Sequence, residues 1–189
     1  MSKGRLEAFS DGVLAIVITI MVLELEIPHE ASLAALAPVF PKFLSYVLSF
    51  IFLGIYWNNH HHLWQAVERV SGSVLWANLH LLFWLSLIPF VTGWMGENHF
   101  STIPVALYGF ILWMSALAYY LMVRALMVHH EKDSVLAAAL GSGTKERISL
   151  VLYTASIPLA FVSSWIALAI YVTVAAMWLV PDRRIESKL

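Results

Sequence analysis

Cysteine is absent from the 189 residues of this chain, and charged residues are scarce. Without thiols the chain can form no disulfide framework, zinc–thiolate site or iron–sulfur cluster, and it has no thiol nucleophile. Charged residues make up 12% of the sequence, about half of the ~25% that is usual in soluble domains. The net charge of −1 comes without a clustered basic stripe, which argues against nucleic acid as a partner.

Hydrophobic residues, by contrast, make up 60% of the chain and place it among membrane proteins. Several uncharged runs exceed the ~20 residues that one bilayer-spanning helix needs. The run at 148–181 would be about 51 Å long as a single helix, so we expect two helices that turn near 163–165. The sequence therefore predicts an all-α integral membrane protein, with one domain over 1–189 and six transmembrane helices near 5–27, 42–67, 72–95, 103–126, 147–163 and 165–181.

Six spans put both termini on the same side of the membrane. Ten of the eleven lysines and arginines fall on that side, and only Lys42 falls on the other. The positive-inside rule then predicts cytoplasmic termini for a multi-pass protein of the cell membrane. The opposite face is acidic and favours cations locally, because it carries Glu24, Glu26, Glu30 and Glu97.

The uncharged segment of the first predicted helix is too short to span the hydrocarbon core. Only 12 uncharged residues separate Asp11 from Glu24, about 18 Å of helix against the ~30 Å of the hydrocarbon core. Charged groups at membrane depth usually face a bundle interior or a water-filled cavity. We therefore expect this helix to be central rather than surrounded by lipid.

A seam with steps of four and three residues runs along this helix, the spacing of helices that pack against copies of themselves. Its members are Arg5, Phe9, Gly12, Ile16, Thr19 and Leu23. Ile20 borders the same stripe. At about 100° per residue, Ser10 and Asp11 point away from the seam, toward other helices of the same chain.

A purely structural interpretation of these residues also stands. The apolar members of the seam can be ordinary core, and Thr19 can donate to the carbonyl four residues earlier, as membrane threonines often do. Ser10 and Asp11 can simply cap a helix start.

A polar cluster on the second and third predicted helices supplies hydrogen-bond partners for Asp11. Its members are Trp57, Asn58, Asn59, His60, His61, His62, Asn78 and His80. Consecutive histidines point about 100° apart on a helix and cannot converge on one metal ion. His129 and Asp133 have a suitable spacing but no third ligand. We expect a structural polar network, with no metal site and no cofactor.

Residues 5–12 read R-x-x-x-F-S-D-G. This stretch resembles the signature of the potassium-channel family named after endolysosomal transmembrane protein 175. It opens the first span, as in that family, and is followed by W-N-N-H-H at 57–61, Asn78, and Pro89-Phe90. The resemblance is strongest before Phe90 and weak in the last two spans.

The resemblance implies that four copies of this six-helix unit surround a pore, so that the partners are the chain itself, the bilayer and monovalent cations. It implies that the first helix lines the pore, with the constriction at Ile16, Ile20 and Leu23 and the potassium preference at Thr19. It also implies a network that couples the motif residues Arg5, Phe9, Ser10 and Asp11 to Trp57, Asn59, His60 and Asn78.

The Thr-Val-Gly-Tyr-Gly filter of P-loop potassium channels is missing, so backbone carbonyl cages cannot supply selectivity. We expect a potassium-preferring cation channel with modest selectivity. A secondary transporter is the alternative within membrane transport, but inverted repeats and broken helices are not evident in the first span. A membrane-embedded enzyme using Asp11 and the histidines lacks a recognisable nucleophile–base pair. We therefore expect no enzyme.

Overall fold

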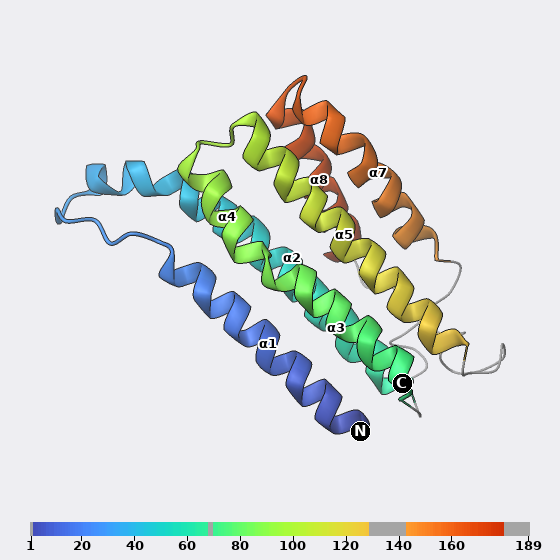
Figure 1. Cartoon of the computed structure of the whole chain (residues 1–189). Coiled ribbons are helices and arrows are strands. Elements are labelled where there is room, and N and C mark those ends of the chain that lie inside the picture. The colour runs from blue at the N-terminus through green and yellow to red at the C-terminus, as the bar shows by residue number, and fades with distance from the viewer. Residues whose placement is uncertain (1, 68–69, 129–142, 180–189) are drawn as a thin grey trace.

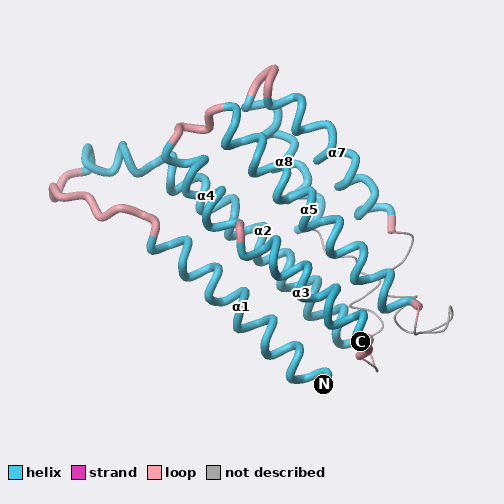
Figure 2. Tube along the Cα trace, in the orientation of Figure 1, coloured by secondary structure: helices cyan, strands magenta, loops and turns pink. Residues whose placement is uncertain are grey.

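The computed structural model describes residues 2–67, 70–128 and 143–179, and the regular elements in these ranges are all helices (Figure 2). The all-α prediction is therefore confirmed for this part of the chain. The elements are α1 (Lys3–Leu23), the 3-10 helix η1 (Leu33–Val39), α2 (Phe40–Gln65), α3 (Gly72–Ser86), α4 (Ile88–Glu97), α5 (Thr102–Met127), α7 (Thr144–Ala160) and α8 (Ser164–Leu179).

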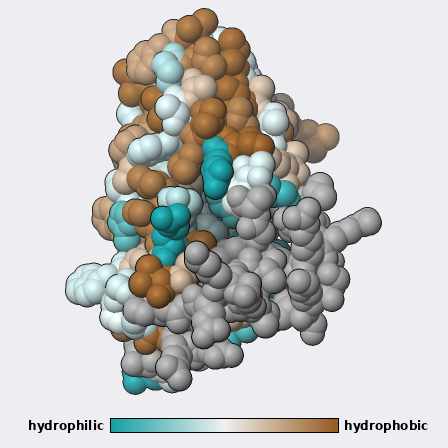
Figure 3. All heavy atoms as spheres, turned by 90° about the vertical axis from the view of Figure 1, so that its right-hand side faces the viewer, coloured by the Kyte–Doolittle hydropathy of each residue, from teal (hydrophilic) through white to brown (hydrophobic). Residues whose placement is uncertain are grey.

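Among the described residues, four helical stretches are long and apolar enough to cross a bilayer: Lys3–Leu23, Leu33–Gln65, Gly72–Glu97 and Thr102–Met127. The helices α7 and α8 are shorter, with 17 and 16 residues, and they turn back on each other around residues 161–163. Figure 3 shows the side of the molecule on which α7 lies, with hydrophobic side chains covering its upper part. This distribution suits a multi-pass membrane protein.

Several helix bounds differ by a few residues from those predicted, as in α7, which is Thr144–Ala160 rather than 147–163. The first helix ends at Leu23 rather than at residue 27, and Pro28 disfavours the helical conformation at residue 27. The third span is interrupted at Leu87, between α3 and α4. Pro89 has no N–H to donate to the preceding turn, and its ring crowds the carbonyl four residues earlier. Residues 180–181 of the last predicted span lie outside the described part.

The helix α1 lies at the edge of the single chain, beside α2, α3 and α4 (Figure 1). On the other side of these helices, α5 packs against α3, α4, α7 and α8. A large apolar core fills the bundle, including the fully buried Trp64, Tyr108 and Tyr171. In the described part of the chain, one side of α1 has no neighbouring helix. A central position for α1 is therefore a property that only an assembly of several chains can have.

Candidate functional site

The helix α1 has two opposite faces. The face toward the bundle is buried and consists of Leu6, Ser10, Leu14, Val17 and Met21. The other side of the helix is exposed, and along it run Arg5, Phe9, Gly12, Ile16, Thr19 and Leu23, which we call the uncovered stripe; Ala8, Ala15 and Val22 beside it are exposed too. Ile16 is 59% exposed and Leu23 80% exposed, and Ile20 beside them is 41% exposed. The predicted seam therefore lies on the side of α1 that the described residues leave uncovered.

Thr19 is the single hydroxyl of the uncovered stripe. Its Oγ1 donates a hydrogen bond to the Ile16 carbonyl oxygen at 2.9 Å. This is the backbone bond that the structural interpretation expects, although the acceptor is three rather than four residues earlier. Because the hydroxyl proton is engaged in this bond, the oxygen lone pairs are left to accept from outside the helix. The back-bond thus orients Thr19 as an acceptor.

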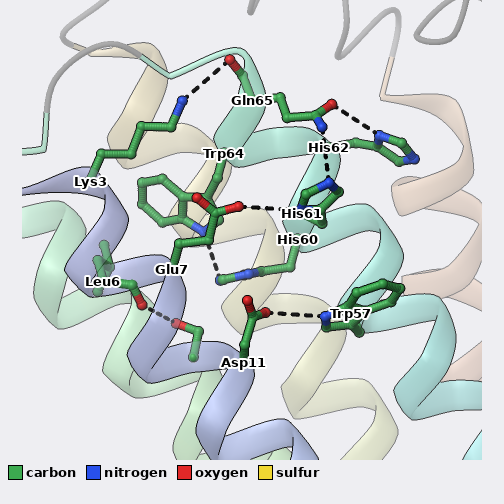
Figure 4. A network of polar contacts seen from close by, with 11 residues as sticks. Lys3, Leu6, Glu7, Asp11, Trp57, His60, His61, His62, Trp64 and Gln65 are labelled. Carbon is green, nitrogen blue, oxygen red and sulfur yellow. Dashed lines mark hydrogen bonds and ion pairs between the residues drawn. The ribbon is translucent and has the colours of Figure 1, made fainter.

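A ladder of side-chain contacts joins the N-terminal half of α1 to the end of α2 (Figure 4). It advances by four residues on each helix, so its contacts lie on one face of each, and it runs antiparallel. The contacts are the Lys3 ammonium with the Gln65 carbonyl at 3.4 Å, Glu7 Oε1 with His61 Nδ1 at 3.2 Å, and Asp11 Oδ1 with Trp57 Nε1 at 3.1 Å. The Trp57 indole also stacks on the His61 ring. The Asp11 carboxylate therefore has a neutral donor as its partner.

A second set of contacts is buried between α1, α2 and α3. Asn78 Nδ2 donates to Ser10 Oγ at 3.0 Å, and Ser10 Oγ donates to the Leu6 carbonyl at 2.9 Å. Asn78 Oδ1 lies 2.8 Å from His60 Nε2. All three polar side chains are almost completely buried. A buried polar group is stable only when it is hydrogen-bonded, so this chain of contacts fixes the relative position of the three helices.

His60 Nε2 has two competing partners. It lies 2.8 Å from Asn78 Oδ1, which can only accept, and 2.8 Å from Trp64 Nε1, which can only donate. A ring nitrogen carries either a proton or an available lone pair. The protonated Nε2 therefore binds Asn78, and the unprotonated Nε2 binds Trp64. His60 Nδ1 is buried and has no partner among the described residues, so it does not resolve this competition.

Three residues that the resemblance assigns to the coupling network lie elsewhere. Arg5 and Phe9 are on the uncovered stripe, and Arg5 makes no hydrogen bond or ion pair within the described ranges. Asn59 donates to the Ile55 carbonyl of its own helix, and its carbonyl accepts from Tyr119 of α5. The reason is geometric, because Asn59 is two residues, or about 200°, away from Trp57 around the helix.

The network also includes residues that the motif does not contain. Glu7, Gln65 and Trp64 take part, and a usable signal was the four-residue spacing on both α1 and α2. His80 instead accepts from Trp84 within its own helix. His129 and Asp133 lie outside the described residues.

The C-terminal half of α1 is followed by an electrostatic clamp. The Lys42 ammonium, on the first turn of α2, contacts Glu26 Oε1 at 2.9 Å and Glu97 Oε1 at 3.1 Å. The bond from Lys42 lowers the pKa of the exposed Glu26 carboxyl below its ordinary value. Beside the clamp, a Cβ on Gly96 would lie 2.6 Å from Ser45 Oγ and 2.7 Å from the Lys42 Cα. No side chain can fit between α2 and α4 at this point.

The fold and this site define a class: an all-helical membrane protein whose polar residues hold helices together and whose first helix leaves an apolar stripe uncovered. Comparison with known proteins narrows the class. The model of the family described as endosomal/lysosomal potassium channel TMEM175 matches residues 5–89. A potassium channel of Chryseobacterium sp. (strain P1-3) is 55% identical over 100% of this chain and 98% of its own length.

More distant relatives agree. A potassium channel of Streptomyces collinus is 33% identical over 88% of this chain and 86% of its own. The crystal structure of a lysosomal potassium-selective channel TMEM175 homolog from Chamaesiphon minutus superimposes with a TM-score of 0.78. The superposition covers 94% of this chain and 96% of the homolog, and the two sequences are 26% identical. The chain belongs to the TMEM175 family. This confirms the resemblance seen in the sequence, and because the family is one of ion channels, it confirms that the chain is not an enzyme.

Proposed function

We propose that four copies of this chain form a potassium-preferring cation channel in the cell membrane, with both termini in the cytoplasm. The uncovered stripe of α1 lines the central pore. The channel conducts potassium ions without a cofactor. The observation that carries the proposal is the division of α1 into a buried face and a stripe that stays uncovered from Arg5 to Leu23. Potassium is proposed as the permeant ion because two relatives that match over most of their length are named potassium channels.

The positions of the charged residues argue that α1 as a whole is shielded from lipid. An exposed apolar stripe alone suits either environment, since lipid tails are as apolar as leucine. The 12 residues between Asp11 and Glu24, however, span only about 18 Å. If α1 bordered lipid, its ionised ends would lie within the hydrocarbon, which costs several kcal/mol for each charge. A water-filled pore at the centre of several chains removes this cost.

The two central stripe residues divide the work of a pore. A ring of Ile16 side chains narrows the pore and closes it by steric block or dewetting, with Ile20 and Leu23 as further apolar layers. A ring of Thr19 hydroxyls, one turn away, offers oxygen atoms to a partly dehydrated cation. The bond from Thr19 to the Ile16 carbonyl keeps these oxygens turned outward as acceptors. Hydroxyl ligands are fewer than those of a carbonyl cage, so the preference is modest.

The test is replacement of Thr19 by valine, which removes the hydroxyl and keeps the side-chain shape. In vesicles with the purified protein, we expect the potassium-to-sodium flux ratio to fall several-fold toward unity while cation flux persists. Thr173→Val is the matched control, because Thr173 is also an exposed, back-bonded threonine but lies on α8. An unchanged ratio in Thr19→Val would remove the selectivity role from this residue.

Two further outcomes test the assembly itself. Absence of cation flux from the unmodified protein under every gradient tried would sink the channel proposal. The mass of the protein in detergent should correspond to four chains. A monomer would leave the uncovered stripe without partners and would contradict a shared pore.

A further inference from the structure

A groove of about 600 Å³ opens beside the uncovered stripe, between the C-terminal half of α1, the start of α2, and α4. Ligand sites for small molecules typically have volumes of ~300–1,000 Å³ and mostly apolar walls. Ile16 and Ile20 line the groove from α1, and Phe90 and Trp94 line it from α4. All four side chains are exposed or half-buried in the single chain. The groove therefore has the size and the wall of a site for an apolar molecule.

One carboxylate enters this apolar groove without a partner. Glu24 Oε2 lies 3.9 Å from the position that a Cβ would take at Gly93, so the glycine leaves room for it against α4. Within the described residues Glu24 makes no hydrogen bond and no ion pair. The neighbouring Glu26 and Glu97 both pair with Lys42. Glu24 is thus the carboxylate of the groove that is left for an external cation.

The rest of the groove also favours a positive charge. The carboxylates of Glu24 and Glu97 line it, against the single ammonium of Lys42. Phe90 and Trp94 stack with ring centroids 6.1 Å apart and an interplanar angle of 21°, and the faces of aromatic rings attract ammonium groups. A metal ion would find only one unpaired carboxylate, and an anion would be repelled.

We infer that this groove binds a cationic amphiphile, with its ammonium head beside Glu24 and its alkyl chain along Ile16 and Ile20. Both isoleucines belong to the region that forms the constriction in the proposed pore, so a bound chain would reduce cation flux. This effect on flux rests on the proposed function. The binding itself does not.

The test measures equilibrium binding of octyltrimethylammonium to the protein in nanodiscs of neutral lipid. We expect saturable binding that is about tenfold weaker in Glu24→Gln, and unchanged in Glu30→Gln, an exposed glutamate outside the groove. The neutral octyl glucoside should bind more weakly and should not distinguish Glu24→Gln from the unmodified protein. Equal affinity of octyltrimethylammonium for both proteins would overturn the inference. Absence of saturable binding would also overturn it, and is the result expected if another copy of the chain or a lipid fills the groove.

A second variant separates loss of the site from loss of structure. Gly93→Leu should occupy the space beside Glu24 and weaken binding at least as much as Glu24→Gln, while the thermal unfolding midpoint stays near that of the unmodified protein. Unchanged affinity in this variant would place the amphiphile elsewhere and overturn the inference. Potassium flux with and without octyltrimethylammonium completes the test. If the amphiphile binds but the protein conducts no cations at all, the channel proposal fails while the binding site stands.

Discussion

The two halves of α1 are held in different ways. The N-terminal half is joined to α2 and α3 by the ladder and by the buried contacts of Ser10, Asn78 and His60. The C-terminal half borders an open groove, and the chain beyond it is held by one ion pair, from the exposed Glu26 to Lys42. The first half is thus fixed within its own subunit. The second half has fewer constraints, so we expect any displacement of α1 to be largest near Ile20 and Leu23.

The physical cause of this difference is the surroundings of the polar groups. A buried hydrogen bond gains strength from the low local dielectric, and a buried partner left alone costs its full desolvation. Exposed ion pairs are screened by water and salt. The following variants test this contrast.

The largest effect is expected for Asn78→Leu. Leucine has a similar size but cannot donate to Ser10 or accept from His60, which leaves buried polar atoms of α1 and α2 without this partner. The free energy of unfolding should fall by about 1–3 kcal/mol, measured by denaturation in detergent. Asn58→Leu is the control, because Asn58 is an asparagine of the same polar cluster but is exposed. Equal effects of both variants would contradict a special role for the buried contacts.

An intermediate effect is expected for the contact between Asp11 and Trp57. Trp57 is 46% exposed, so its bond to the carboxylate is partly open to competition from water. A double-mutant cycle with Asp11→Ala, which removes the acceptor, and Trp57→Phe should give a coupling energy of about 0.6 kcal/mol, the average measured for hydrogen bonds between membrane helices, and no more than about 1.7 kcal/mol. Strictly additive unfolding energies would show that this rung of the ladder contributes nothing.

The smallest effect is expected at the clamp. Because Lys42 lowers the pKa of Glu26 below its ordinary 4.5, the ion pair stabilises the fold above the unfolded-state pKa, and this contribution is lost as the pH falls through the lowered pKa. Thermal unfolding between about pH 6 and pH 3 should show this loss at low salt and less of it at high salt. In Lys42→Met this part of the pH dependence should disappear. Its persistence there would assign it to other carboxyl groups.

Much of the fold follows from the sequence, because uncharged runs between charged segments have the length of membrane helices. The turn between α7 and α8 follows from the length of the last run. The lengths of the runs do not predict the end of the first helix or the interruption at Leu87, although Pro89 signals the latter. Apolar runs measure length, whereas a break depends on backbone groups that proline removes.

The candidate site was predictable to a lesser degree. The seam identified the side of α1 that stays uncovered, since steps of four and three residues define one helix face. The partners of the polar residues were harder to predict, because neighbours in sequence such as Trp57 and Asn59 point in opposite directions on α2. Pairing Asp11 with Trp57 needs the antiparallel register of two helices. The sequence contains the four-residue spacing of the ladder but not the register itself.

The close approach of α4 to α2 at Gly96 limits which substitutions can be accepted during evolution. Even the methyl group of alanine would collide with Ser45 and with the backbone of Lys42, so α2 and α4 would have to separate and the lysine would move away from Glu97. The charged residues of the clamp can therefore be substituted one at a time. Gly96 can be substituted only if the packing of α2 against α4 changes as well. We expect relatives that share the clamp to have inherited glycine here. Those with a larger residue should have lost the lysine as well.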